Sequence, residues 1–388
     1  MNRREVKKAP VLRFKGFTND WEQRKFENLV SRLSKTSNNE SLPNVTYDDI
    51  KSKENSLNKD ITELTHGKKG IHFNKDDILV GKLRPYLGNI LLARFNGIAV
   101  GDFWVLSPKD NNISSFLFDL IQTSKYKYIS NLSSGSKMPR SDWNLVSKAS
   151  FWVPIQQEQN KIGKIFQLID NLVSLQQRKL KLLRTLKSGL SFKLFNKKHL
   201  NNLSQISLDQ IGRTYSGLTG KSKKDFGHGH AFYVSYLNVN QNEIGNPKQI
   251  DRIEIDKKQN LVQKNDIFFT ISSETPEEVG LTSLWPVSCK NLYLNSFCFG
   301  FRINTKMFIP LYLGYLFRSE YFREKVLPLA QGISRYNLSK NNVLKIKIGQ
   351  EEIAIQEKYA KVMNDLDSDI LRQKKKVKEL KLCKKFLP

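Results

Sequence analysis

The sequence predicts an α+β fold: two α/β domains separated by two long antiparallel coiled-coil helices, arranged as a pseudo-twofold internal repeat. Three observations predict it. Two long amphipathic segments match each other at a constant offset of 197 residues, a shorter amphipathic segment precedes each, and β-rich runs occupy the remainder of both halves. At 388 residues, the chain is also long enough for two or three ordinary domains.

Four consecutive parts are predicted. Residues 1–154 form the first domain, 155–195 the first long helix, 196–349 the second domain and 350–388 the second long helix. Pro154 suits the start of a helix, where its missing amide donor costs little. No Pro/Ser-rich linker separates the domains, so the first helix is predicted to act as the spacer.

Short β-rich runs, broken by Gly, Asn, Asp and Pro, characterise both domains. The runs are DDILVGKL, GNILLARF and DFWVLSP in the first half, and HAFYVSYLNV, NDIFFTIS and SFCFGFRI in the second. The shorter amphipathic segments are SSFLFDLIQTSKYKYI and PLYLGYLFRSEYFREKV, which we align at the same offset of 197. Each half is therefore expected to be mixed α and β, followed by a long helix.

Each long segment carries one narrow apolar stripe with steps of mainly three and four residues, which is typical of a coiled-coil seam. The first stripe consists of Ile162, Ile165, Phe166, Ile169, Val173, Gln176, Leu180, Leu183, Leu186 and Leu190. The second consists of Tyr359, Val362, Met363, Leu366, Ile370, Gln373, Val377, Leu380, Cys383 and Leu387. Neither helix can bury its stripe alone, so the two are predicted to pair with each other. The predicted pairing residues are Ile162, Ile169, Gln176, Leu183, Tyr359, Leu366, Gln373 and Leu380.

Gln176 and Gln373 interrupt both stripes at the same place. Two interpretations remain open: a device that fixes helix register, as polar seam residues do, or a polar residue tolerated near solvent. Outside the stripes, both helices are rich in Lys and Arg. For many of these residues, a solvated face is a sufficient explanation.

A strong positive charge limits the partners. Lys and Arg number 64 against 37 Asp and Glu, a formal net charge of +27, far beyond what solubility needs. A polyanion is therefore expected. Nucleic acid is favoured over a membrane, because the longest apolar runs fall short of the roughly 20 residues that span a bilayer. With no signal-peptide pattern at the start, a cytoplasmic location is expected.

Motifs for catalysis or metal binding are incomplete. GLTGKS resembles the end of a phosphate-binding loop, but Tyr215 stands where that motif needs its first glycine. The three cysteines form no CxxC pair, and the paired histidines of HGKKGIH and FGHGH lack metal-ligand spacing. We find neither a convincing nuclease cluster nor the motifs of a DNA methyltransferase. The chain is therefore expected to be non-catalytic, with no cofactor of its own.

The whole pattern resembles the specificity subunit of type I restriction-modification systems. VLRFKGFTNDWEQRKFENL, at residues 11–29, looks like the usual start of that family. DDILVGKLRPYLGN with GIAVGDFWVL looks like one type of its target recognition domain, and SGLTGKSKKDFGHGHAFYVSYLNV with NDIFFTISSETPEEVG like another. The resemblance covers essentially the whole chain, and the phrases are specific only in combination.

The resemblance implies a DNA-reading role. Each target recognition domain would read half of a split, asymmetric site in double-stranded DNA, while the two helices would dock methyltransferase subunits and set the spacing of the half-sites. The resemblance further implies two methyltransferase subunits and two restriction/translocase subunits as partners. S-adenosylmethionine, ATP and Mg²⁺ would belong to those subunits.

Candidate DNA contacts are chosen by chemistry, because Arg and Lys can bind guanine or phosphate and Asn can bind adenine. In the first domain they are Lys82, Arg84, Tyr86, Lys137 and Arg140; in the second they are Lys221, Lys223, Lys224, Ser273, Glu274, Arg335, Tyr336 and Asn337. The loops SSGSKMPRSDW and AQGISRYNLS are aligned as counterparts. Ordinary surface or loop-packing roles remain open for each residue.

Two other functions remain open. A stand-alone DNA-binding regulator is compatible with the charge and the duplication, and would bind its site tightly without a partner. A nuclease with an unrecognised site would cleave DNA with Mg²⁺ alone. Independently of the resemblance, a helix of about 33 residues is about 50 Å long, which suits two domains reading half-sites one DNA turn, roughly 34 to 36 Å, apart.

Overall fold

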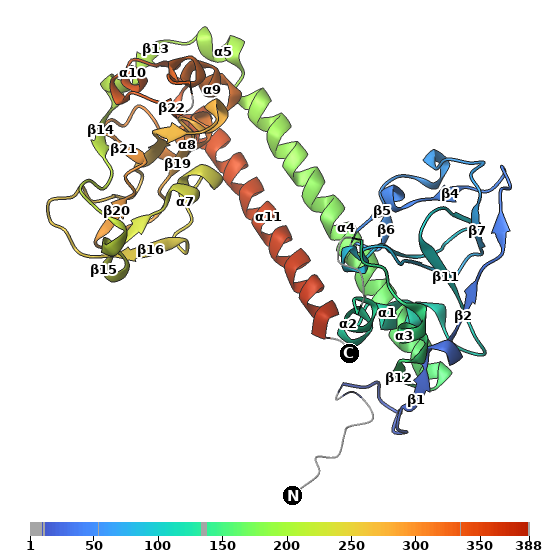
Figure 1. Ribbon diagram of the computed structural model, residues 1–388. Helices are drawn as coiled ribbons and strands as arrows, with labels where there is room; N and C mark the ends of the chain where they lie inside the picture. Colours follow the sequence, from blue (N-terminus) through green and yellow to red (C-terminus); the bar gives the residue numbers. More distant parts are fainter. Residues whose placement is uncertain (1–9, 11, 53, 133–137, 334, 387–388) are drawn as a thin grey trace, which may run out of the picture. The chain divides into compact units, whose positions relative to one another are not determined.

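The computed structural model describes residues 10, 12–52, 54–132, 138–333 and 335–386 (Figure 1). The chain divides into two compact units: residues 1–177 together with 376–388, and residues 178–375. Each unit combines a mixed α/β domain with part of each long helix. The long helices are α4 (Gln156–Leu194; green in Figure 1) and α11 (Ile353–Phe386; red).

A four-stranded antiparallel sheet, in the order β2-β11-β8-β9, forms the centre of the first domain. Its strands are β2 (Val30–Leu33), β8 (Ile78–Gly81), β9 (Ile90–Leu92) and β11 (Phe103–Pro108). The sheet separates two hydrophobic cores, because alternate side chains of a strand point to opposite faces. Ile78 and Val80 of β8 join one core and Leu79 joins the other.

Smaller elements complete the first domain. A second sheet has the order β3-β7-β10-β4. The remaining strands are β1 (Glu22–Lys25), β3 (Thr36–Ser37), β4 (Asn44–Val45), β5 (Ile50–Lys51), β6 (Ser56–Leu57), β7 (Gly70–Phe73), β10 (Gly97–Ala99) and β12 (Ser150–Val153). The helices are α1 (Ser114–Ile121), α2 (Ser124–Ser130) and α3 (Trp143–Lys148), with short 3₁₀ turns η1 (Phe26–Asn28), η2 (Tyr47–Asp49), η3 (Ile61–Glu63) and η4 (Pro85–Leu87).

The second domain repeats this plan with a central sheet in the order β14-β21-β17-β19. Its strands are β13 (Gln205–Ser207), β14 (Gly212–Ser216), β15 (Phe226–Val234), β16 (Ile250–Ile253), β17 (Ile267–Thr270), β18 (Ser272–Ser273), β19 (Thr282–Leu284), β20 (Leu292–Leu294), β21 (Cys298–Ile303), β22 (Tyr336–Asn337) and β23 (Lys347–Gly349). Its helices are α5 (Lys197–Asn201), α6 (Leu208–Ile211), α7 (Tyr236–Gln241), α8 (Pro310–Leu316), α9 (Glu320–Val326) and α10 (Lys340–Leu344), with η5 (Lys223–Asp225), η6 (Pro276–Glu278) and η7 (Leu327–Leu329).

The predicted fold class is confirmed, with one correction to the repeat. Helices α4 and α11 start 197 residues apart, as predicted. The short helices do not keep that offset, because the N-caps of α1 and α8 are Ile113 and Ile309, which are 196 residues apart. The extra residue lies after these helices: ten residues separate the end of α9 from Asn337, and nine separate the end of α2 from Arg140, the two residues that pair with equivalent strand ends.

The start of α4 is fixed by the N-terminal segment and by close packing. Arg13 donates from Nε and Nη2 to the carboxylate of Glu158 at 2.9 and 2.6 Å, and Glu158 is 1% exposed. Gly163 lies against α1, where an added Cβ would come within 2.0 Å of Ser115 Oγ. The arginine of the opening phrase VLRF therefore anchors the helix to the first domain.

Among the described residues, an ion pair joins the long helices in each unit, and the two pairs are related by the repeat. In the first unit, Lys384 Nζ lies 2.7 Å from Asp170 Oδ1. In the second, Lys187 Nζ lies 2.6 Å from Asp367 Oδ1. Asp170 and Asp367 are 197 residues apart, as are Lys187 and Lys384.

The second unit also shows the helix direction. Eight residues after Lys187, the ring of Phe195 packs edge-on against Tyr359, which lies eight residues before Asp367, with ring centroids 6.3 Å apart. The residue numbers therefore run in opposite directions, and the helices are antiparallel.

Within the part of the chain that is described, no helix is long and apolar enough to cross a membrane.

Candidate nucleic-acid interface

In the first domain, residues 139–141 pair with residues 82–84, which follow the end of β8, and both segments carry basic side chains. The Ser141 amide donates to the Lys82 carbonyl at 2.8 Å, and the Arg84 amide donates to the Pro139 carbonyl at 2.7 Å. Arg140 consequently forms an isolated antiparallel bridge with Leu83. The loop before β11 joins them, since the Lys82 amide donates to the Asp102 carbonyl at 2.9 Å. We call residues 82–84, residues 139–141 and Asp102 together the strand-end frame.

Asp102 holds two of the predicted DNA contacts. Its carboxylate accepts from Arg140 Nε at 3.1 Å and Nη2 at 2.9 Å, and lies 3.4 Å from Lys82 Nζ. The Arg140 side chain is still 55% exposed. Tyr47 donates its hydroxyl to the Asp102 carbonyl at 2.5 Å, and burial raises the pKa of Tyr47 to about 12. The acid therefore orients two cations that remain accessible to a ligand.

The other first-domain candidates border this frame. Arg84 is exposed and has a positive φ of 50°, which is uncommon for a residue other than glycine. Tyr86 follows it on η4 and is 56% exposed. Lys137 lies outside the described residues.

The second domain contains the same strand-end frame. Here β18 pairs antiparallel with β22, joining Ser272 to Asn337 and Ser273 to Tyr336. The Leu338 amide donates to the Ile271 carbonyl at 2.9 Å, and the Ile271 amide to the Phe297 carbonyl at 2.9 Å. Strand pairing thus brings the predicted 273–274 and 335–337 segments together.

The pairing also fixes the alignment of the two loops residue by residue. Arg140 bridges Leu83, and Asn337 pairs with Ser272, at the same place in each frame. Asn337 is therefore the counterpart of Arg140, whereas a match of side-chain types would have chosen Arg335. Arg84 likewise corresponds to Ser273, which is buried and donates to Glu278 Oε2 at 2.8 Å. Arg335 and Glu274 are both exposed.

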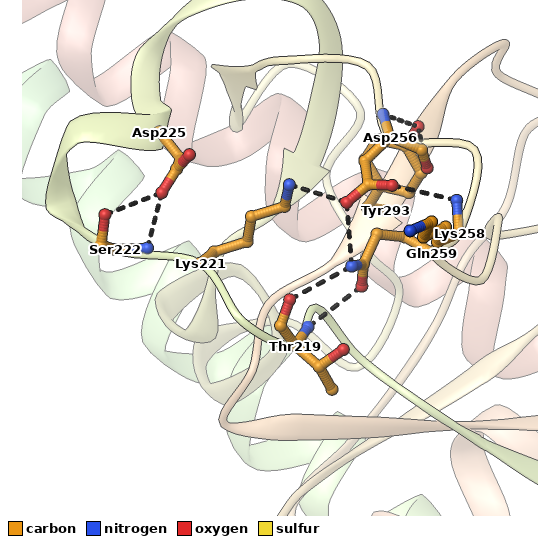
Figure 2. Close-up of polar contacts among 8 residues, drawn as sticks. All are labelled: Thr219, Lys221, Ser222, Asp225, Asp256, Lys258, Gln259 and Tyr293. Carbon is orange, nitrogen blue, oxygen red and sulfur yellow. Dashed lines mark hydrogen bonds and ion pairs between the residues drawn. The ribbon is translucent and has the colours of Figure 1, made fainter.

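The predicted lysines of the second domain lie on a different loop, shown in Figure 2. Lys221 Nζ lies 2.8 Å from Asp256 Oδ2, and only 15% of the lysine side chain is exposed. Hydrogen bonding to Lys221 lowers the pKa of Asp256 to about 2, and the same bond raises the pKa of Lys221. Gln259 fixes the loop by accepting from the Thr219 amide at 3.0 Å and donating to its carbonyl at 3.1 Å.

The ion pair with Asp256 therefore holds Lys221 within its own domain, whereas Lys223 and Lys224 are exposed on η5. The turn that carries them is closed by Ser222, which donates its amide and hydroxyl to Asp225 (Figure 2). No hydrogen bond or ion pair among the described residues joins this loop to β18 and β22. The structure thus separates the second-domain candidates into two groups.

The helix stripe differs from the predicted one at two equivalent positions. Leu186 is 51% exposed and Cys383 is exposed, whereas the adjoining Lys187 and Lys384 are partly buried in their ion pairs. Ile165 and Val362 are each 36% exposed. The apolar stripe is therefore interrupted near one end of each helix by a paired charge.

The predicted pairing residues show graded burial. Gln373 is 4% exposed, and the others are partly buried: Ile162, Ile169, Gln176, Leu183, Tyr359, Leu366 and Leu380. Leu387 lies outside the described residues. Partial burial is expected where two helices pack only against each other, because one side of each seam residue remains exposed to solvent.

Sequence reasoning missed Asp102 and the two ion pairs. Asp102 stands alone in a turn after Gly101, so no motif singles it out. The ion pairs do have a sequence signal, because both the acids and the lysines repeat at the offset of 197. A search of the repeat for conserved charge, as well as for apolar residues, would have found them. Among the described residues, no three His, Cys, Asp or Glu side chains gather as metal ligands.

Comparison with known proteins places this geometry in a class of DNA specificity proteins. The family described as type I restriction modification DNA specificity domain matches residues 18–185. A crystal structure of a type I restriction-modification system S subunit from M. genitalium has a TM-score of 0.63 at 17% identity, covering 97% of this chain and 96% of that chain.

A second solved structure, described as the structural basis of complex assembly and conformational transition of the type I R-M system, has a TM-score of 0.53 at 13% identity, with 97% of both chains covered. The resemblance carried by the sequence is confirmed. Residues 18–185 match the type I restriction-modification specificity family, and the chain has the fold of type I S subunits.

Proposed function

We propose that this chain is the sequence-reading, non-catalytic subunit of a type I restriction-modification complex. The observation that carries the proposal is the repetition of one sheet order and one strand-end frame in two domains whose loops differ. Two related but unequal domains suit a bipartite, asymmetric site in double-stranded DNA. The net charge of +27 suits a polyanion, because contacts with phosphates supply most of the non-specific affinity for DNA.

The long helices are proposed to dock two methyltransferase subunits. Besides the seam with α11, helix α4 carries a second apolar stripe, between 36% and 62% exposed: Ile165, Leu168, Leu172, Leu175, Leu182 and Leu186. Steps of three, four and seven residues are those of a coiled coil, which points to a helix as the docking element. At the offset of 197, α11 has Val362, Asp365, Asp369, Arg372, Glu379 and Cys383, so the stripe belongs to α4.

Catalysis is proposed to belong to the partner subunits. Methyltransferase subunits would bind S-adenosylmethionine, and restriction/translocase subunits would use ATP and Mg²⁺, in the cytoplasm where the target DNA lies. The role of this chain is to hold two readers and the docking helices in one polypeptide.

Sequencing of methylated adenines tests the proposal. The chain is produced together with a type I methyltransferase subunit, and the DNA exposed to the complex is sequenced for methylated adenine. A motif of two short defined segments separated by undefined bases is expected. A single continuous motif, or a motif that does not change when the second domain is exchanged, would contradict it.

A further inference from the structure

The two strand-end frames have matching backbones and different side chains. At the crossing position, the first domain has Arg140 and the second has Asn337. We propose that these two residues are equivalent specificity-determining residues, with Arg140 reading guanine in one half-site and Asn337 reading adenine in the other. This inference rests on the proposed function, to which it adds residues and bases.

The backbone holds both positions firmly. The Ser141 and Leu338 amides donate to the carbonyls of Lys82 and Ile271 at 2.8 and 2.9 Å. Asn337 is held from its other side as well, by reciprocal hydrogen bonds of 2.9 and 2.8 Å with Gln331. A fixed backbone allows a side chain to discriminate between bases, because a reader must be held close to its productive geometry.

The guanidinium of Arg140 is oriented by Asp102 and still has N–H donors available for a ligand. Asp102 accepts two of its five N–H donors, through Nε and one hydrogen of Nη2. The terminal edge formed by Nη1 and Nη2 keeps its donors. Paired donors at this spacing match O6 and N7 of guanine, the commonest specific contact between proteins and DNA.

Asn337 presents the amide that is complementary to adenine. It is exposed, and its Nδ2 donates only a long hydrogen bond of 3.3 Å, to the Arg335 carbonyl. An asparagine side chain can accept from N6 and donate to N7 of adenine. In the second frame, Phe297 takes the place of Asp102, so the carboxylate that orients Arg140 has no counterpart there.

Exposed apolar side chains border both frames. Tyr86 and Met138 are 56% and 57% exposed in the first domain, and Phe297 and Ile333 are 53% and 98% exposed in the second. At 98% exposure, Ile333 buries almost none of its side chain within the described residues. Apolar side chains beside hydrogen-bonding readers contact the thymine methyl group in the major groove, so the surroundings also fit a base-reading surface.

The test uses the complete complex of this chain with its methyltransferase subunit and duplexes randomised at every position of the site. Arg140→Ala is expected to lower the preference for guanine at one position of the first half-site roughly 5- to 150-fold, because alanine has no donor for guanine, whereas lysine can itself bind guanine. The second half-site should not change. Asn337→Ala should produce the converse, a loss of preference for adenine in the second half-site alone.

Arg94→Ala is the matched control, because Arg94 also has a 55% exposed side chain beside an acid, Asp76, but lies outside the frame. It should weaken binding to all duplexes equally, with no change of preference. If Arg140→Ala and Asn337→Ala leave every base preference intact, the inference is wrong, and the bipartite motif of the unmodified complex still supports the proposed function. If the unmodified complex has no bipartite motif, the proposed function itself fails.

Discussion

At the scale of single residues, Asp119 shows how the repeat tolerates a change of chemistry. Asp119 on α1 and Tyr315 on α8 lie at the same distance from the N-caps Ile113 and Ile309. Tyr315 donates its hydroxyl to Asp367 Oδ2 at 2.9 Å. Asp119 has a shielded Oδ2 without a hydrogen-bond partner, beside the pair of Asp170 and Lys384. The first half therefore has a carboxyl group where the second has a phenol.

Burial raises the pKa of Asp119 to about 8, so its carboxyl group is protonated at neutral pH. Between about pH 4, the ordinary value for an aspartate, and pH 8, the folded chain keeps a proton that the unfolded chain has released. The contribution of Asp119 to the free energy of unfolding therefore falls as pH rises through this window. Above pH 8, both states are ionised and the loss is complete.

Asp119→Asn should remove this dependence, because asparagine keeps the shape without the titrating proton. The thermal unfolding midpoints of variant and parent are measured from pH 5 to pH 9. We expect the variant to gain stability relative to the parent as pH rises. A constant difference over the whole range would show that Asp119 does not titrate there.

At the scale of elements, the two ion pairs between α4 and α11 select one alignment of the helices. Asp170 with Lys384 and Lys187 with Asp367 are related by the repeat, so a shift of one helix would break both. Lys187 also lies 2.6 Å from Glu243 Oε2, which links the helix to the second domain. The pairs are partly exposed, so their role is alignment rather than a large gain in stability.

A charge exchange tests this role. Asp170→Lys should place two lysines together and lower stability by on the order of 1 kcal/mol. Adding Lys384→Asp should restore part of the loss, measured as the midpoint of thermal unfolding. Lys381→Asp serves as the control, since Lys381 is exposed on the same helix. Equal recovery with either aspartate would mean that only net charge matters.

The helices could be predicted from sequence because the apolar period is a local signal that repeats over many turns. The apolar period does not distinguish Lys187 and Lys384 from the other basic residues of these helices, so it did not reveal their ion pairs. The strand order of the central sheets could not be predicted, since it depends on pairing between distant segments, such as β2 with β11. The frame depends on such pairing too, and it selects Asn337, among Arg335, Tyr336 and Asn337, as the counterpart of Arg140.

At the scale of the whole molecule, the chain joins two mixed α/β domains through helices of 39 and 34 residues. A helix of 39 residues is about 58 Å long, somewhat longer than the sequence alone had indicated. The central claim of our account is that the helices set the distance between two half-sites read by different domains. Length changes in a helix should then alter the DNA site without altering the bases read.

Inserting four residues into one long helix between the ion-pair positions tests this claim most directly. The insertion adds roughly 6 Å to the helix. Methylated-adenine sequencing of the variant complex should return the same two half-sites with one or two more undefined base pairs between them. An active complex whose half-sites keep their original spacing would contradict the account.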